Sequence, residues 1–398
     1  MKTKLIILML FIVYSTAALA SEKVATMLVE KQHFSTENFI TVSGKTIAQV
    51  DIGWESYGTL NEEKDNVILI THYFSGTSHA AGKYQADDVQ PGYWDALIGP
   101  NKAIDTNKFF VISSDTLVNA NWHDPNVITT GPASINPATG KPYGLDFPVV
   151  TITDFVNVQK RLLESLGIKK LHAVMGASMG SFQALEWAVR YPAQVERLIH
   201  VIGGATMDAW TVAALEKWAL PIRLDKNWQQ GDYYDKQPPL DGLAATMLNI
   251  TQDAMHPIIY NASFPDFTVR DQGALKDIRT LPKLSQTLAA RALARAKTQD
   301  ANHVLYLVRA SQLFSAGMQG DVNEALKKIT AKTLLLPASN DLLLRPENMR
   351  KVYEAMQELD KDVAISEISG GWGHLDGIFS ISPKAQLIRE FLEDDNHE

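Results

Sequence analysis

The sequence feature that most constrains the fold is a serine between two glycines, placed where an apolar run gives way to a helical pattern. Residues 171–192 read LHAVMGASMGSFQALEWAVRYP, so that Ser178 follows a candidate strand and precedes a candidate helix. In this setting a G-x-S-x-G turn holds the serine in a strained conformation, because a Cβ two residues to either side would collide. The helix N-terminus that follows offers free N–H groups to a developing negative charge. Ser178 is therefore the candidate nucleophile; the alternative is a glycine-rich turn with a capping serine.

A serine nucleophile needs a base and an orienting carboxylate, and after a turn of this kind they follow in the order Ser, Asp or Glu, His. Five histidines follow in the chain: His200, His256, His303, His374 and His397. His374 lies in the loop GGWGH after the last apolar run and is the candidate base, whereas His200 fits a core histidine within a strand. Asp341 follows the apolar run Thr333–Pro337 and is the candidate acid; the alternative makes it a turn or capping residue.

A second group of residues could stabilise the negative charge that develops on the substrate oxygen during the reaction. The apolar run VILIT at 67–71 leads into HYFSG, and the N–H groups of Phe74 and Met179 are the predicted oxyanion hole. His72 and His79 lie near this loop without a third metal ligand at suitable spacing, so we interpret them as loop structure. Phosphate-loop, dinucleotide-binding and H-E-x-x-H patterns are absent, and no metal or cofactor is implied.

Apolar runs alternate with helical patterns along the chain, which predicts an α/β fold with a mostly parallel central sheet. The predicted strands are Phe39–Val42, Ala48–Ser56, Val67–Thr71, Phe109–Ser113, Leu171–Met175, Leu198–Ile202, Thr333–Pro337 and Ala364–Ile368. The predicted helices are Asp154–Leu166, Met179–Tyr191, Glu347–Leu359 and Pro383–Glu393. Between residues 204 and 328 the strand pattern disappears and helical segments such as Leu284–Ala296 and Leu305–Gly317 take over. We therefore predict a core of residues 21–203 and 329–398, interrupted by a helical lid at 204–328.

The first twenty residues, MKTKLIILMLFIVYSTAALA, have the pattern of a cleavable signal peptide. The apolar run is too short for a membrane anchor, which predicts an exported chain, periplasmic or secreted, cleaved after Ala20 and without stable membrane insertion. The chain has no cysteine, so disulfides and thiolate chemistry are excluded. Its 37 basic and 45 acidic residues give a formal net charge of −8, which argues against nucleic acid as a partner.

Longer segments resemble the homoserine O-acetyltransferase family of α/β-hydrolases. The matching stretches are YGTLN at 57–61, SHAAG at 78–82, PGYWD at 91–95, the 25 residues from Thr130 to Asp154, and GASMGSFQALEWAVRYP from 176. The resemblance implies a serine that takes an acyl group from an acyl-CoA and passes it to an amino-acid hydroxyl. It places Ser178, Asp341 and His374 on the family's triad, implies a small-molecule acyl substrate and leaves a homodimer open.

The chain also departs from the family pattern at the positions that bind the amino acid. Counting back from the GDY segment that contains Tyr233 places Ala219 where the family has a carboxylate-binding arginine, with Arg223 out of register. Leu375 separates His374 from Asp376, whereas the family's substrate-binding aspartate follows its histidine directly. Asp376, Tyr233 and Arg223 are candidate substrate-binding residues. Without the arginine clamp, hydrolysis of esters or related acyl compounds is the expected activity. Acetyl transfer to homoserine is the alternative, and a non-catalytic binding protein is a more distant one.

Overall fold

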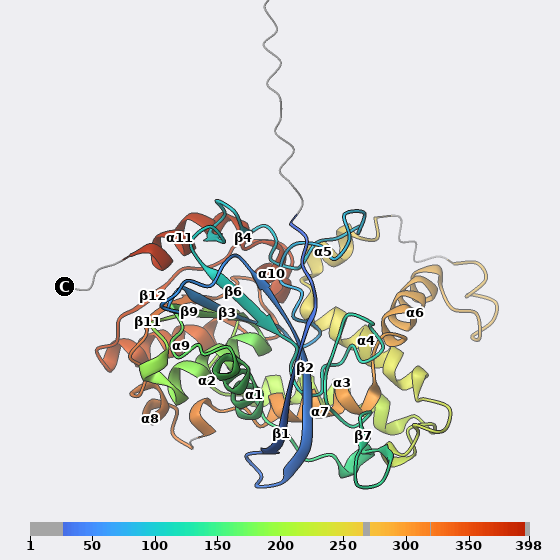
Figure 1. Cartoon of the computed structure of the whole chain (residues 1–398). Helices are drawn as coiled ribbons and strands as arrows, with labels where there is room; N and C mark the ends of the chain where they lie inside the picture. Colours follow the sequence, from blue (N-terminus) through green and yellow to red (C-terminus); the bar gives the residue numbers. More distant parts are fainter. Residues whose placement is uncertain (1–26, 266–270, 319, 395–398) are drawn as a thin grey trace, which may run out of the picture.

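The computed structural model describes residues 27–265, 271–318 and 320–394, and an eight-stranded sheet lies at its centre (Figure 1). In spatial order the strands are β1 (Gln32–Ile40), β2 (Thr46–Tyr57), β6 (Phe110–Ser114), β3 (Val67–Thr71), β9 (Ala173–Ala177), β10 (Arg197–Val201), β11 (Lys332–Leu336) and β12 (Val363–Ile365). The pairings of β1 with β2 and of β2 with β6 are antiparallel, and the remaining five are parallel. The predicted mostly parallel α/β sheet is confirmed.

The central strands β3, β6, β9 and β10 are buried at every residue and are mostly apolar, because helices cover both faces of the sheet. In β3, Val67 and Leu69 belong to one core cluster, while Ile68 and Ile70 belong to the other, as the two-residue period of a strand requires. Figure 1 shows α1 and α2 below the sheet and α11 above it. The sheet-flanking helices are α1 (Ile152–Ser165), α2 (Met179–Arg190), α9 (Pro346–Glu358), α10 (Asp376–Phe379) and α11 (Ala385–Glu393).

Most of the chain between β10 and β11 forms a helical layer to the right of the sheet in Figure 1, whereas the last helix of this segment, α8 (Val322–Leu326), lies at the lower left beside α9. The helices of the layer are α3 (Ala209–Leu224), α4 (Leu240–Ala254), α5 (Pro257–Ala262), α6 (Lys283–Ala296) and α7 (Ala301–Gln312). The exact division into core and lid at residues 204 and 328 stays a prediction. In the part of the chain that the structure describes, no helix has the length and apolarity needed to cross a membrane.

The predicted strand Leu171–Met175 lies two residues later, as β9, and two other predicted elements begin several residues earlier than expected. The first strand covers Gln32–Ile40 instead of Phe39–Val42, because it is the edge strand and its largely exposed, polar residues show no apolar run. Helix α7 covers Ala301–Gln312 instead of Leu305–Gly317, because the Asp300 side chain accepts a hydrogen bond from the N–H of His303 at 2.9 Å and starts the helix earlier.

Four two-residue strands, β4 (Ile98–Gly99), β5 (Ile104–Asp105), β7 (Ile135–Asn136) and β8 (Lys141–Pro142), are too short to leave a sequence pattern. The predicted signal peptide lies outside the described residues.

His200 is a buried histidine in β10, as expected from its place in an apolar strand. Its Nδ1 lies 3.0 Å from the carbonyl oxygen of Ser181, and its Nε2 has no hydrogen-bond partner among the described residues. Desolvation by burial lowers the pKa of His200 from 6.5 to about 4. The folded protein therefore holds this imidazole neutral under conditions where the unfolded chain already binds a proton.

The stability of the protein is expected to fall as the pH is lowered from about 6.5 to 4, because protons then bind the unfolded chain in preference to the folded one. His200 alone contributes about 3 kcal/mol to this loss. His200→Asn, which keeps a donor at the position of Nδ1, should show a smaller decrease in thermal midpoint over the same range. His33→Asn, on the exposed edge strand, serves as the matched control. An unchanged pH dependence in His200→Asn would contradict this assignment.

Candidate active site

Ser178 sits at the turn between β9 and α2 in a strained conformation, with φ 56° and ψ −123°. The two glycines of the turn are required by close backbone approaches. A Cβ on Gly176 would lie 2.2 Å from the carbonyl oxygen of Gly180, and a Cβ on Gly180 would lie 2.1 Å from that of Thr71. The Ser178 N–H donates to the carbonyl oxygen of Val201 at 3.0 Å, which ties the turn to the next strand. The strain predicted from the G-x-S-x-G pattern is therefore present in the structure.

Three side chains from separate parts of the chain meet at this turn. His374 Nε2 lies 2.7 Å from Ser178 Oγ, and His374 Nδ1 lies 2.6 Å from Asp341 Oδ2. The three residues are buried, with 9%, 5% and 3% of Ser178, His374 and Asp341 exposed. The histidine can take the serine proton on one ring nitrogen while the carboxylate orients the other. The structure thus brings together the three residues singled out in the sequence.

The second oxygen of Asp341 holds its own loop in place. Oδ1 accepts hydrogen bonds from the N–H groups of Leu343 and Leu344, at 2.8 and 2.9 Å. Asp341 therefore has both of the roles considered from the sequence. Its Oδ1 stabilises the turn, and its Oδ2 contacts the His374 ring. Because the turn fixes the carboxylate, Oδ2 is held toward the histidine ring.

Phe74 and Met179 line the same small cavity as Ser178, with a volume of about 30 Å³. Among the described residues, neither backbone N–H has a hydrogen-bond acceptor, so both are free to bind a substrate oxygen. The remaining walls are apolar apart from the hydroxyls of Thr211 and Ser311. The Phe74 ring packs edge-on against Trp218 with 5.4 Å between ring centroids.

A buried carboxylate that the sequence did not single out braces the loop after β3. Glu55 Oε1 lies 2.8 Å from Lys31 Nζ, Oε2 lies 3.0 Å from His79 Nδ1, and the Tyr84 hydroxyl donates to Oε1 at 2.6 Å. Burial raises the pKa of Glu55, but the hydrogen bond from His79 and the charge of Lys31 outweigh it and lower the pKa to about 2. Glu55 is one of two carboxylates in β2, the other being the partly exposed Asp51, so the sequence pattern did not single it out. His79 is loop structure, as interpreted from the sequence.

The structure does not bring the three candidate substrate-binding residues to the Ser178 cavity. Asp376 is fully buried and accepts hydrogen bonds from the Ser380 hydroxyl at 2.6 Å and from the N–H groups of Trp372 and Gly373 at 3.2 Å. It therefore braces the loop that carries His374.

The other two candidates lie in the helical layer. The Tyr233 hydroxyl donates to Asp300 at 2.7 Å, and Arg223 is ion-paired with Glu216. Ala219 is fully buried in the core, so no cation replaces the missing arginine at that position. Within residues 27–265, 271–318 and 320–394, no group of three or more acidic or histidine side chains could hold a metal ion.

Comparison with known proteins places this site in a family. A family model described as alpha/beta hydrolase fold matches residues 125–379. A homoserine O-acetyltransferase from Methanococcus vannielii is 37% identical, over 92% of this chain and 73% of its own length. The chain belongs to the homoserine O-acetyltransferase family of α/β-hydrolases. The predicted family and fold are confirmed, and the chain is an enzyme of this fold.

Solved structures similar to this chain carry two different names. The crystal structure of homoserine O-acetyltransferase from Bacillus anthracis is 38% identical, with a TM-score of 0.89, over 92% of this chain and 98% of the other. The crystal structure of esterase E22 is 56% identical, with a TM-score of 0.90, over 92% of this chain and all of the other. Similarity to solved structures therefore does not identify the acyl acceptor, which has to be inferred from the residues of the site.

Proposed function

We propose that this family member is a serine-dependent acyl-transfer enzyme that hydrolyses short-chain esters. The observation that carries the proposal is the small cavity at Ser178, whose walls, as far as the structure describes the chain, contain no charged side chain. Its volume of about 30 Å³ suits an acetyl-sized acyl group. The cavity therefore offers a nucleophile and an apolar acyl site, but no partner for an ionised acceptor.

The contacts of the site support a two-step mechanism. His374 Nε2 takes the proton of Ser178 Oγ, which attacks the ester carbonyl, while the N–H groups of Phe74 and Met179 bind the resulting oxyanion. His374 then returns the proton to the leaving alcohol, and the acyl group stays on Ser178. In the second step His374 takes a proton from water, which attacks the acyl-enzyme, and the acid is released as Ser178 regains its proton. Asp341 keeps the His374 ring in the required tautomer throughout.

Acetyl transfer to homoserine is the second candidate, and the names of the relatives from Methanococcus vannielii and Bacillus anthracis favour it. Homoserine carries an ammonium and a carboxylate group, and both must be paired when they are buried. The structure commits Arg223 to Glu216 and Asp376 to the His374 loop, so neither is available for that pairing. Export of the chain, which we also propose from residues 1–20, would separate it from cytosolic acyl-CoA.

The acceptor is tested by product analysis with p-nitrophenyl acetate in the presence and absence of millimolar homoserine. A missing bidentate contact to a carboxylate weakens the binding of the acceptor by about 2–4 kcal/mol. This loss lowers the efficiency of the acceptor roughly 30- to 700-fold. We therefore expect free acetate as the product in both cases, at unchanged rates. A parallel incubation with acetyl-CoA and homoserine tests the second candidate directly. O-acetylhomoserine as the main product in either assay would replace the hydrolase proposal with the transferase one.

A further inference from the structure

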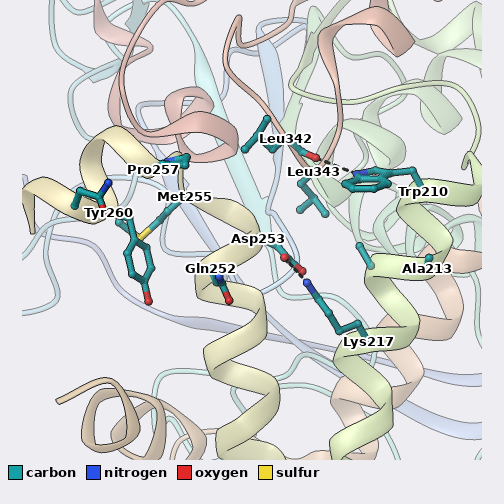
Figure 2. Close-up of a pocket in the computed structure, with 12 residues that line it drawn as sticks. Trp210, Ala213, Lys217, Gln252, Asp253, Met255, Pro257, Tyr260, Leu342 and Leu343 are labelled. Carbon is teal, nitrogen blue, oxygen red and sulfur yellow. Dashed lines mark hydrogen bonds and ion pairs between the residues drawn. The ribbon is translucent and has the colours of Figure 1, made fainter. Parts of the chain in front are cut away.

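A larger pocket of about 590 Å³ adjoins the Ser178 cavity. Figure 2 shows its walls, which come from α3, from α4 and α5, and from the loop that follows Asp341. Leu343 lines both this pocket and the Ser178 cavity, so the two spaces adjoin at this residue. The site is therefore strongly asymmetric, with a small space at the nucleophile and a space many times larger beside it.

The position of the large pocket relative to the nucleophile is set by hydrogen bonds. Trp210 Nε1 donates to the carbonyl oxygen of Leu342 at 3.1 Å, and the Thr211 hydroxyl donates to the carbonyl oxygen of Leu343 at 3.4 Å. The N–H of Leu343 donates to the Asp341 carboxylate. The same short loop thus connects the pocket wall to helix α3 and to the acid of the Ser–His–Asp arrangement.

The charged groups in the pocket wall already compensate each other. Lys217 Nζ lies 2.5 Å from Asp253 Oδ1, a contact drawn in Figure 2, and Trp218 Nε1 donates to Asp253 Oδ2 at 2.7 Å. The remaining surface includes the aromatic rings of Trp210 and Tyr260. An indole and a phenol ring beside a neutralised ion pair favour an uncharged, apolar ligand over an ionic one.

We propose that this pocket binds the alcohol part of the ester, and that the enzyme prefers acetate-sized esters of bulky, uncharged aromatic alcohols. The inference rests on the proposed function. With the acyl group in the 30 Å³ cavity, the alkoxy oxygen points past Leu343 into the larger pocket. When the C–O bond breaks, that oxygen takes the proton from His374, and the alcohol leaves through the pocket while the acyl group stays on Ser178.

Substituting Ala213 tests the pocket, because this exposed residue of α3 lies in its wall. The measurement is kcat/KM for 1-naphthyl acetate divided by kcat/KM for ethyl acetate. Ala213→Phe fills part of the pocket and should lower this ratio by about tenfold or more, since an aromatic ring loses much of its buried area. Trp210→Ala removes an aromatic wall and should lower the ratio in the same direction. Ala290→Phe, the same change at an exposed position of α6, should leave the ratio unchanged.

The outcomes separate this inference from the proposed function. If the wild-type enzyme hydrolyses neither ester, the proposed function fails, whatever the variants do. If it hydrolyses both and neither Ala213→Phe nor Trp210→Ala changes the ratio, the pocket does not bind the alcohol. An unchanged ester ratio together with a selective loss of acetyl-CoA turnover would assign the pocket to the thiol arm of a thioester, which also overturns the proposal.

Discussion

Ser178→Ala is expected to lower kcat for ester hydrolysis by roughly 10⁶-fold, the loss seen when the serine of such a triad is removed. The substitution deletes only Oγ, whose partner is His374 Nε2, and it retains the Cβ that already occupies the strained turn. The thermal midpoint should therefore change little. A fluorophosphonate probe followed by peptide mass spectrometry should label Ser178 in the wild type and no serine in the variant.

The matched control is Ser311→Ala, because Ser311 also places a hydroxyl at the wall of the Ser178 cavity. It should lose no more than about tenfold in kcat, since its hydroxyl makes no hydrogen bond to the imidazole or to any other part of the chain that the structure describes. Activity above a few per cent in Ser178→Ala would show that the nucleophile is another residue. A large loss in Ser311→Ala alone would point to the same conclusion.

Asp341→Asn is expected to lower kcat by about 10⁴-fold without unfolding the protein. The asparagine oxygen can still accept from the N–H groups of Leu343 and Leu344, so the loop keeps its turn. Its amide then faces His374 Nδ1 as a donor and stabilises the tautomer with the proton on Nε2, where Ser178 needs a lone pair.

The comparison is made with Asp232→Asn, an exposed aspartate of the helical layer whose loss should leave kcat unchanged. The rate of fluorophosphonate labelling at Ser178 should fall together with kcat in Asp341→Asn, because both reactions need the activated hydroxyl. Hydrolysis within tenfold of the wild type would remove Asp341 from the catalytic assignment and leave it as a turn residue only.

The local sequence pattern was enough to predict those turns and strands whose conformation depends on residues close together in the chain. The elbow at Ser178 could be predicted because Gly176 and Gly180 are the only residues that fit its close backbone approaches. The central strands could be predicted because a strand covered on both faces forms a nearly continuous apolar run, as in β3. The edge strand Gln32–Ile40 could be located only roughly, because its exposed faces impose no apolar pattern.

Chain order and loop position were enough to single out Asp341 and His374, because the carboxyl ends of parallel strands meet at one edge of the sheet. Only the tertiary structure placed them 2.6 Å apart, and only it showed that Asp376 turns inward to brace the His374 loop. Glu55 and Lys31, 24 positions apart, form their ion pair through the pairing of β1 and β2 that no local pattern predicts.

The pocket beside Leu343 likewise exists only where α3, α4, α5 and the loop after Asp341 pack together. Sequence determines backbone conformation wherever neighbouring residues exclude the alternatives, as at the Ser178 turn. Tertiary packing decides which side chains from distant parts of the chain lie together in a buried space. A buried polar group needs a hydrogen-bond partner, and that partner can come from any part of the chain that the fold brings near.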